Sequence, residues 1–237
     1  MIIAIDGPAG SGKSTTARAV AERLGYVYVD TGAMYRTVAL AFILNKMPPD
    51  RASTEEIREL LASMRLEMRF GRDGMQILLD GQDVTGEIRT RLVTEVASRV
   101  AVIPEVRERM VEEQRDLARI QQKERGGVVF EGRDIGTIVF PDADVKVFMK
   151  ASVELRAQRR YEELQEQEKD DSNVSFEDVL FDIRARDERD ISRQLSPLRK
   201  AEGTIEIDTS DIDVREQVEM VIQEVQAVRE RRNRTSV

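Results

Sequence analysis

A lysine and a serine at the end of a glycine-rich stretch have the most specific chemistry in this chain. Residues 7–14 are Gly-Pro-Ala-Gly-Ser-Gly-Lys-Ser, which matches the phosphate-binding pattern G-x-x-x-x-G-K-[ST]. The glycines let backbone N–H groups surround a phosphate chain, Lys13 adds a charge for the β- and γ-phosphates, and the Ser14 hydroxyl can reach Mg²⁺. The stretch therefore predicts a nucleotide-phosphate site. Its ATP-binding residues would be Gly7, Pro8, Ala9, Gly10, Ser11, Gly12, Lys13, Ser14 and Thr15.

The segments on either side must position this stretch, and they support the prediction. Residues 2–5 form an apolar run, as expected of a strand buried on both faces of a parallel sheet. Residues 15–24 are good helix formers with an apolar stripe along one side. A glycine-rich turn that contains Gly-Lys-Ser by chance is the alternative, and the strand before it and the helix after it disfavour that alternative.

The rest of the chain predicts an α/β fold with one irregular region. Four further strands are predicted at 26–29, 128–130, 145–149 and 204–207, alternating with helices, and the first two of them are expected to be buried. Between residues 64 and 88 apolar and polar residues alternate around tight turns, which predicts a small antiparallel insertion with one solvent-exposed face.

Two of the predicted helices have apolar stripes that we expect to be buried. The helix that starts at Pro104 would bury Val106, Met110, Val111 and Leu117. The closing helix, from about Ile212, would bury Val214, Val218, Val221, Ile222 and Val225. We expect the basic tail at 229–237 to be frayed.

Polar residues follow two of the predicted strands, at the edge where α/β folds bind ligands. Arg36 lies in the first turn of a predicted helix, where the helix dipole disfavours a cation, and this favours an anion ligand over an ordinary surface arginine. Arg133 and Asp134 follow the strand at 128–130 and have glycines on both sides. We favour a ligand-binding role for this pair, and an ion pair that braces the loop is the alternative.

A helix predicted after Ser175 changes from apolar to charged along one side. Ser175 and Asp178 are close to a capping box, with Asp in place of the usual Glu. The first inward positions are Phe176, Val179, Leu180 and Ile183. Steps of three and four residues then give Arg186, Arg189, Asp190 and Arg193. The stripe favours a polyanion site, although a solvated helix end braced by pairs such as Arg186–Asp190 is also possible.

Composition excludes several kinds of chemistry. The 237 residues contain neither cysteine nor histidine, so disulfides, thiolate catalysis and cysteine zinc sites are excluded. General acid–base work at neutral pH would need a carboxylate or a lysine, whereas phosphoryl transfer needs mainly positioning and charge. A net charge of −8 argues against non-specific nucleic-acid binding. With no apolar run long enough for a membrane span and no basic leader before the first one, a cytoplasmic protein is expected.

Five separated motifs, in order, resemble those of the bacterial cytidylate kinases, a family of nucleoside monophosphate kinases. The resemblance covers essentially the whole chain. The motifs are residues 5–15, 30–36 (Asp-Thr-Gly-Ala-Met-Tyr-Arg), 81–89 (Gly-Gln-Asp-Val-Thr-Gly-Glu-Ile-Arg), 132–137 (Gly-Arg-Asp-Ile-Gly-Thr) and 186–190 (Arg-Asp-Glu-Arg-Asp).

The resemblance implies a single P-loop kinase domain with a five-stranded parallel sheet. Its core would be residues 1–30, 90–150 and 175–228. A monophosphate-binding region at 31–100 would contain the antiparallel insertion, a short lid would span 151–172, and 229–237 would be the tail. The implied reaction is ATP + CMP or dCMP to ADP + CDP or dCDP. The implied partners are these nucleotides with Mg²⁺, the implied state is a monomer, and no nucleic acid or membrane is involved.

The resemblance also assigns roles to residues. Arg36, Arg133 and Arg193 look like a clamp on the CMP phosphate, Ser98, Arg107 and Asp134 like cytosine contacts, and Arg186 and Asp190 like sugar contacts. Family members often have serine at the position of Thr31, which keeps the hydroxyl. The residue type at the position of Ser14 varies within the family, and this variation weakens the case for the Ser14 hydroxyl as a direct metal ligand. The catalytic charges would be Lys13 with Arg133, Arg193 and the lid arginines Arg156, Arg159 and Arg160.

Two alternatives remain at the level of sequence. One is a P-loop kinase for another nucleoside monophosphate or for a small metabolite, which would not need the enlarged subdomain or the helix with Arg186 and Arg193. The other is a nucleotide-gated regulatory or nucleic-acid-binding ATPase module, which the acidic net charge disfavours.

Overall fold

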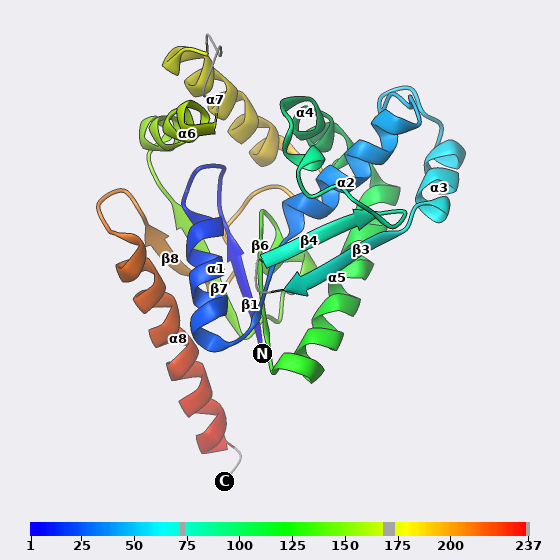
Figure 1. The fold of residues 1–237 in the computed structure, drawn as a ribbon. Helices are drawn as coiled ribbons and strands as arrows, with labels where there is room; N and C mark the ends of the chain where they lie inside the picture. The colour runs from blue at the N-terminus through cyan, green and yellow to red at the C-terminus, as the bar shows by residue number, and fades with distance from the viewer. Residues whose placement is uncertain (72–73, 168–173, 236–237) are drawn as a thin grey trace. The chain divides into compact units, whose positions relative to one another are not determined.

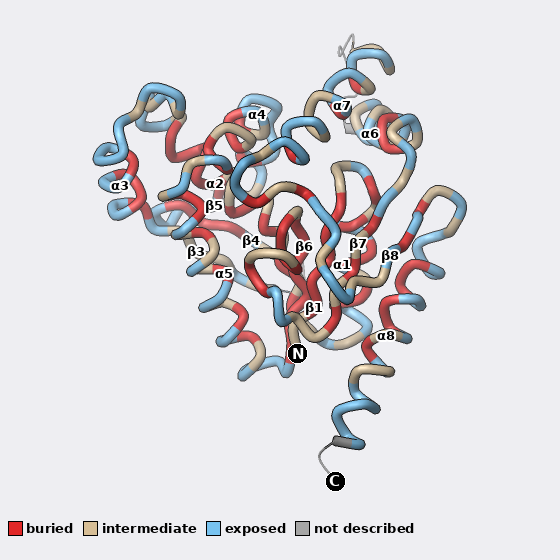
Figure 2. The backbone as a smooth tube through the Cα atoms, turned by 180° about the vertical axis from the view of Figure 1, so that it is seen from behind, coloured by how far each residue is buried: buried red, intermediate tan, exposed pale blue. Residues whose placement is uncertain are grey.

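A five-stranded sheet lies at the centre of the fold in the computed structural model, which describes residues 1–71, 74–167 and 174–235 (Figure 1). The parallel strands have the order β2-β6-β1-β7-β8. Their bounds are β1 Ile2–Asp6, β2 Val27–Asp30, β6 Val128–Gly132, β7 Val145–Lys150 and β8 Ile205–Asp208. Strands β1 and β6 are almost entirely buried (Figure 2), as apolar runs require when both faces of a sheet are covered, whereas the edge strand β8 exposes alternate residues. The predicted sheet is confirmed.

The chain divides by its internal contacts into two compact units, Met1–Tyr26 with Val129–Val237, and Val27–Val128. The expected organisation into core, monophosphate-binding region, lid and tail stays a prediction. Residues 168–172 of the expected lid, 72–73 of the insertion and 236–237 of the tail lie outside the described residues.

The first unit packs its helices in pairs (Figure 1). Helix α1 (Lys13–Leu24) lies beside α8 (Val214–Thr235), and α6 (Val153–Gln167) lies beside α7 (Phe176–Ser192). A short π-helix, η2 (Ile135–Val139), follows β6. The capping box of α7 is confirmed, because Ser175 Oγ accepts the Asp178 N–H at 3.1 Å.

Residues 229–235 of the basic tail are helical, contrary to the expectation that this segment is frayed. Helix α8 continues to Thr235 because arginines of its last turns find partners. Arg229 donates to the Tyr26 hydroxyl at 2.8 Å, and Arg232 pairs with Asp144. The expected burial of Val214 is also wrong, because this first residue of α8 is 40% exposed, whereas the later valines and Ile222 of the stripe are buried.

The second unit contains the predicted antiparallel insertion. Its strands are β3 (Leu66–Gly71), β4 (Gly74–Leu79) and β5 (Gln82–Asp83), with the order β3-β4-β5. The helices are α2 (Thr31–Leu44), α3 (Thr54–Ser63), η1 (Glu87–Arg89), α4 (Arg91–Val100) and α5 (Pro104–Arg125).

Helix α5 buries two of the four residues predicted, Val106 and Met110, and differs from the prediction in the rest. Its buried positions after Val106 are Arg107, Met110, Gln114, Ala118 and Gln121, which recur at steps of three and four. Val111 and Leu117 are adjacent to this stripe and are only half-buried. Polar residues therefore occupy positions where the pattern predicted an apolar face.

No helix within the described ranges combines the length and the hydropathy needed to cross a bilayer.

Candidate active site

The glycine-rich loop between β1 and α1 has the backbone geometry that its sequence predicts. Gly7, Gly10 and Gly12 all have positive φ, at 151°, 74° and 84°. At Gly7 a Cβ atom would lie 2.1 Å from the carbonyl oxygen of Met149, so any side chain there would clash with backbone. The loop leads directly into α1, whose first turn has no acidic residue to occupy its free N–H groups. Glycine geometry and helix start together form a site suited to phosphate oxygens.

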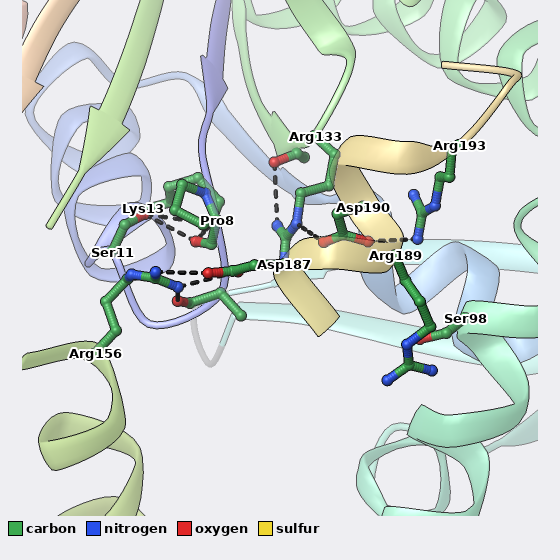
Figure 3. A network of polar contacts seen from close by, with 12 residues as sticks. Pro8, Ser11, Lys13, Ser98, Arg133, Arg156, Asp187, Arg189, Asp190 and Arg193 are labelled. Carbon is green, nitrogen blue, oxygen red and sulfur yellow. Dashed lines mark hydrogen bonds and ion pairs between the residues drawn. The ribbon is translucent and has the colours of Figure 1, made fainter. Parts of the chain in front are cut away.

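Lys13 is the first residue of α1 and is buried beneath this loop. Its Nζ donates to the carbonyl oxygen of Pro8 at 2.7 Å (Figure 3). Burial, together with the charges of Arg133 and Arg186, lowers the pKa of Lys13 to about 7, while Glu131 and Asp6 act in the opposite direction. The loop lysine and two of the predicted acceptor-site arginines are therefore close enough to influence one another.

Ser14 contacts a carboxylate that sequence reasoning did not assign. Its hydroxyl donates to Glu131 Oε1 at 2.8 Å. Glu131 lies near the end of β6 and is buried. A signal was available, because a carboxylate at the end of a buried strand faces the ligand edge of the sheet. A hydroxyl and a carboxylate are oxygen ligands of the kind that Mg²⁺ prefers, so the pair fits the metal that accompanies ATP.

Arg133 and Arg193 form a cluster around the buried carboxylate of Asp190 (Figure 3). Arg133 Nε donates to Asp190 Oδ2 at 2.9 Å, and Arg193 Nη2 lies 2.5 Å from Asp190 Oδ1. Although burial raises the pKa of Asp190, the charges of Arg133, Arg193 and Arg186 hold it below its usual value. Because two arginine side chains share one carboxylate, the cluster keeps a net positive charge that can attract an anion.

The charged stripe of α7 reaches this cluster only in part. Arg186 acts electrostatically on Asp190 and on Lys13, as a shared site requires. Arg189 is exposed and its Nε donates to the Ala185 carbonyl of its own helix at 3.1 Å. The expectation that Arg189 faces a polyanion with the other three is therefore corrected.

Asp134 is buried at the start of η2. The next two residues donate their backbone N–H groups to Asp6, from Ile135 at 2.9 Å and from Gly136 at 2.7 Å. Burial raises the pKa of Asp6 to about 6. The turn that carries Arg133 and Asp134 is thus tied to the end of β1, one residue before the phosphate loop.

The three arginines of the expected lid have different surroundings. Arg156 is buried against the phosphate loop and Asp187. Arg159 donates to the hydroxyl of Thr209 at 3.0 Å, and that hydroxyl donates to the Ser11 carbonyl of the loop at 3.2 Å. Arg160 pairs with Glu163 on the exposed side of α6 and is not brought to the loop.

In the second unit Arg36 is held by Asp30. The two side chains form an ion pair at 2.7 Å, and Asp30 also caps α2 by accepting the Ala33 N–H at 3.0 Å. Among the described residues the buried Nε of Arg36 has no hydrogen-bond partner. An arginine with a buried donor to spare is suited to a further anionic oxygen. Thr31, the first residue of α2, directly follows Asp30 in the chain and is buried.

Arg107 and Ser98 lie on α5 and α4 of the same unit. Arg107 is buried, donates to the Ala101 carbonyl at 3.1 Å, and stands 5.7 Å above the ring centre of Tyr35. Ser98 Oγ is 3.5 Å from the Thr94 carbonyl, one turn earlier. A buried guanidinium stacked on an aromatic ring is a rigid donor, suitable for reading a flat polar ligand.

Comparisons with known proteins agree with this geometry. A family model described as cytidylate kinase matches residues 3–227. A cytidylate kinase of Salinibacter ruber is 47% identical over 227 residues, which cover 96% of this chain and 97% of the relative. The cytidylate kinase of Bacillus subtilis is 44% identical over 224 residues, or 94% of this chain and 96% of the relative. With its phosphate loop and arginine cluster, the chain is an enzyme that belongs to the cytidylate kinase family.

Proposed function

We propose that this enzyme transfers the γ-phosphoryl group of ATP to CMP or dCMP, giving ADP and CDP or dCDP. Family membership supports the phosphorylation of a nucleoside monophosphate. The observation that carries the proposal within the structure is the electrostatic proximity of Lys13 to Arg133 and Arg186. A donor-phosphate lysine and acceptor-site arginines that influence one another fit a reaction between two bound phosphates.

The donor would bind at the glycine-rich loop. The N–H groups of the loop and of the start of α1 surround the phosphates, and Lys13 leaves the Pro8 carbonyl for a phosphate oxygen. Ser14 and Glu131 would hold Mg²⁺. When bound, the metal would supply positive charge to the phosphates of ATP. Within the described residues there is no cluster of three or more carboxylates that could hold an ion alone, so ATP would supply the remaining ligands.

The acceptor phosphate would bind to arginines that now pair with carboxylates. Arg133 and Arg193 share Asp190, and Arg36 has Asp30 and a spare buried N–H. Phosphate oxygens have the charge and spacing of a carboxylate, so a phosphate can take the remaining donors of each fork. Asp190 holds the guanidinium groups of Arg133 and Arg193 in place. It also keeps lone pairs that could accept a sugar hydroxyl, and Arg186 acts on it electrostatically.

The base would be read by polar groups from both units of the chain. Cytosine has an N4 amine that donates and an N3 that accepts. Asp134, held by the η2 turn, accepts from the N4 amine, and Arg107 donates to N3 or O2. Ser98 offers a further hydroxyl contact. Uracil reverses the donor and acceptor pattern at both positions, so its binding would leave these buried groups unpaired.

The mechanism would be direct in-line transfer with no covalent intermediate. The chain has no cysteine or histidine to act as a nucleophile or base at neutral pH. Lys13 and the arginines stabilise the charge that develops on the transferred group. Closure of the lid would exclude water and so suppress ATP hydrolysis.

The test is ADP formation from ATP over a panel of acceptors: CMP, dCMP, UMP, AMP, shikimate, gluconate and single-stranded DNA. CMP and dCMP should be the best acceptors, and Lys13→Ala should lose about 10²-fold or more in kcat, the scale expected for one preorganised charged group. Preference for another acceptor, or ADP formation stimulated by DNA, would overturn the proposal.

A further inference from the structure

Helix α7 presents two carboxylates, one turn apart, to two different groups of arginines (Figure 3). Asp190 holds Arg133 and Arg193. Asp187 holds Arg156, the lid arginine closest to the phosphate loop, through two bonds of 3.1 and 2.6 Å. The proposed mechanism already uses Asp190, whereas nothing in it so far uses Asp187.

Arg156 is almost fully engaged in this arrangement. Its Nε donates to the Ala151 carbonyl at 3.1 Å, and its Nη1 donates both to the Ala9 carbonyl of the phosphate loop and to Asp187, each at 3.1 Å. Its Nη2 donates to the other oxygen of Asp187 at 2.6 Å. A guanidinium has five N–H donors, so one donor, on Nη2, is left for a further oxygen.

The backbone around Arg156 is just as closely fitted to the loop. A Cβ atom placed on Gly10 would lie 3.0 Å from both the Cβ and the carbonyl oxygen of Arg156. Gly10 has φ of 74°, so the loop at this point admits no side chain. The position of the Arg156 guanidinium is therefore set jointly by Ala9, Gly10 and Asp187.

A second ion pair between the same helices provides a comparison. Glu154 on α6 and Arg184 on α7 pair at 3.1 Å, with side chains that are 64% and 60% exposed. In the Arg156–Asp187 pair the side chains are 4% and 15% exposed. Solvent screens the first pair, so its loss should have little effect. Loss of Asp187 would leave the buried guanidinium of Arg156 without half of its hydrogen bonds.

Asp187 is not needed to hold α6 and α7 together. The two helices share an apolar cluster built on Ala157, Val179 and Ile183, with Val153, Tyr161, Leu164, Val174, Phe176 and Leu180 packed around it. Burial of this many apolar groups supplies the packing energy of the helix pair. The packing of α6 against α7 therefore does not explain the bidentate Arg156–Asp187 pair, which suggests another role for it.

The geometry points to Asp187 as a positioning residue that holds Arg156 against the phosphate loop, with one N–H left to contact a donor phosphate. This inference rests on the proposed binding of ATP at the loop, and not on the identity of the acceptor. Arg156 is already held in place by Asp187 before any nucleotide binds.

The test compares Asp187→Asn with Glu154→Gln, a matched control on the exposed pair. Binding of the non-hydrolysable ATP analogue AMP-PNP with Mg²⁺ is measured by calorimetry without any acceptor, together with CMP binding, kcat and Tm. We expect D187N to weaken AMP-PNP about tenfold and lower kcat about 10–100-fold, with CMP affinity within twofold and a cooperative unfolding transition kept. E154Q should match the parent in all four. Asp187→Glu, which keeps the carboxylate, should recover part of the loss.

A second variant tests whether the effect of D187N acts through Arg156. Arg156→Lys keeps the charge but loses the fork, so it should reproduce the D187N phenotype, and the double variant should be no worse than either alone. Additive losses, equal weakening of AMP-PNP and CMP, a D187N that behaves as E154Q, or a D187N that does not fold would each overturn the inference. If the parent binds AMP-PNP but makes no CDP, the proposed function is wrong. The AMP-PNP titrations of the variants then still test the role of Asp187.

Discussion

Asp6 and Gly136 are joined by a hydrogen bond of 2.7 Å from the Gly136 N–H to the Asp6 carboxylate, although 130 positions separate them in the chain. The Ile135 N–H reaches the other oxygen of the same carboxylate at 2.9 Å. These are the unpaired donors at the start of η2, so Asp6 caps this short helix from a distant strand. One buried carboxylate thus fixes the turn that follows Asp134 to the strand that precedes the phosphate loop.

This burial of Asp6 has a consequence for stability. The pKa of Asp6 is raised to about 6, from about 4 in an unfolded chain. Between those two values the folded state keeps a proton that the unfolded state has lost, so the contribution of Asp6 to stability falls as pH rises. Asp6→Asn does not titrate. From pH 4 to pH 7 the free energy of unfolding of D6N should therefore rise relative to the parent, by on the order of 2 kcal/mol.

Urea unfolding of both proteins at pH 4, 5.5 and 7 measures this difference. A difference that is constant over the range would show that the Asp6 pKa is not raised by folding. The D6N variant loses one of two N–H acceptors, so its absolute stability can lie on either side of the parent, and only the pH trend decides.

The lowered pKa of Lys13 predicts that ATP binding takes up a proton. At pH 8 a group with a pKa of about 7 is mostly neutral, and contact with phosphates raises that pKa by attraction of opposite charges. Uptake should approach one proton at pH 8 and be small at pH 6. Calorimetry in two buffers of different ionisation enthalpy gives the number directly. Lys13→Arg, whose side chain stays charged, should show no such uptake. No uptake at pH 8 by the parent would contradict the lowered pKa.

Most of the donor site could be predicted from the sequence because its signals are local. The glycine pattern with its flanking strand and helix specifies the loop at Gly7 and the position of Lys13, and the structure has both. The strands of the sheet were also evident, above all β1 and β6, since a strand covered on both faces must be largely apolar.

Pairings between distant residues could not be predicted from local pattern. Nothing in the sequence links Ser14 to Glu131 or Asp6 to Gly136, because the topology of the sheet makes those contacts. In α5 the helix period places Gln114 on the buried face, four residues after Met110, but the residue type gave no sign of its burial, and both polar atoms of its amide lack a hydrogen-bond partner in the described part of the chain. Burial of polar groups depends on tertiary packing and not on helix period.

Arg193 should serve the acceptor and not the donor. It follows α7 directly, and its side chain, 11% exposed, shares Asp190 with Arg133. Arg193→Ala should weaken CMP binding about 10–100-fold, the equivalent of roughly 1.5–3 kcal/mol for a lost charged hydrogen bond, and leave ATP affinity nearly unchanged. Calorimetric titration with each nucleotide measures both. Arg184→Ala, on an exposed part of α7, is the control. Equal weakening of CMP and ATP would refute the assignment.

The central claim is that this enzyme acts on CMP because buried groups match cytosine, and the CMP-to-UMP ratio of kcat/KM tests it most directly. The ratio should be high in the parent and should fall in Asp134→Ala, because that change removes the acceptor for the N4 amine of cytosine and relieves the clash of a carboxylate with O4 of uracil. If Asp134 only braced the loop that carries Arg133, both substrates would lose by the same factor. A ratio that Asp134→Ala leaves unchanged would therefore contradict the account.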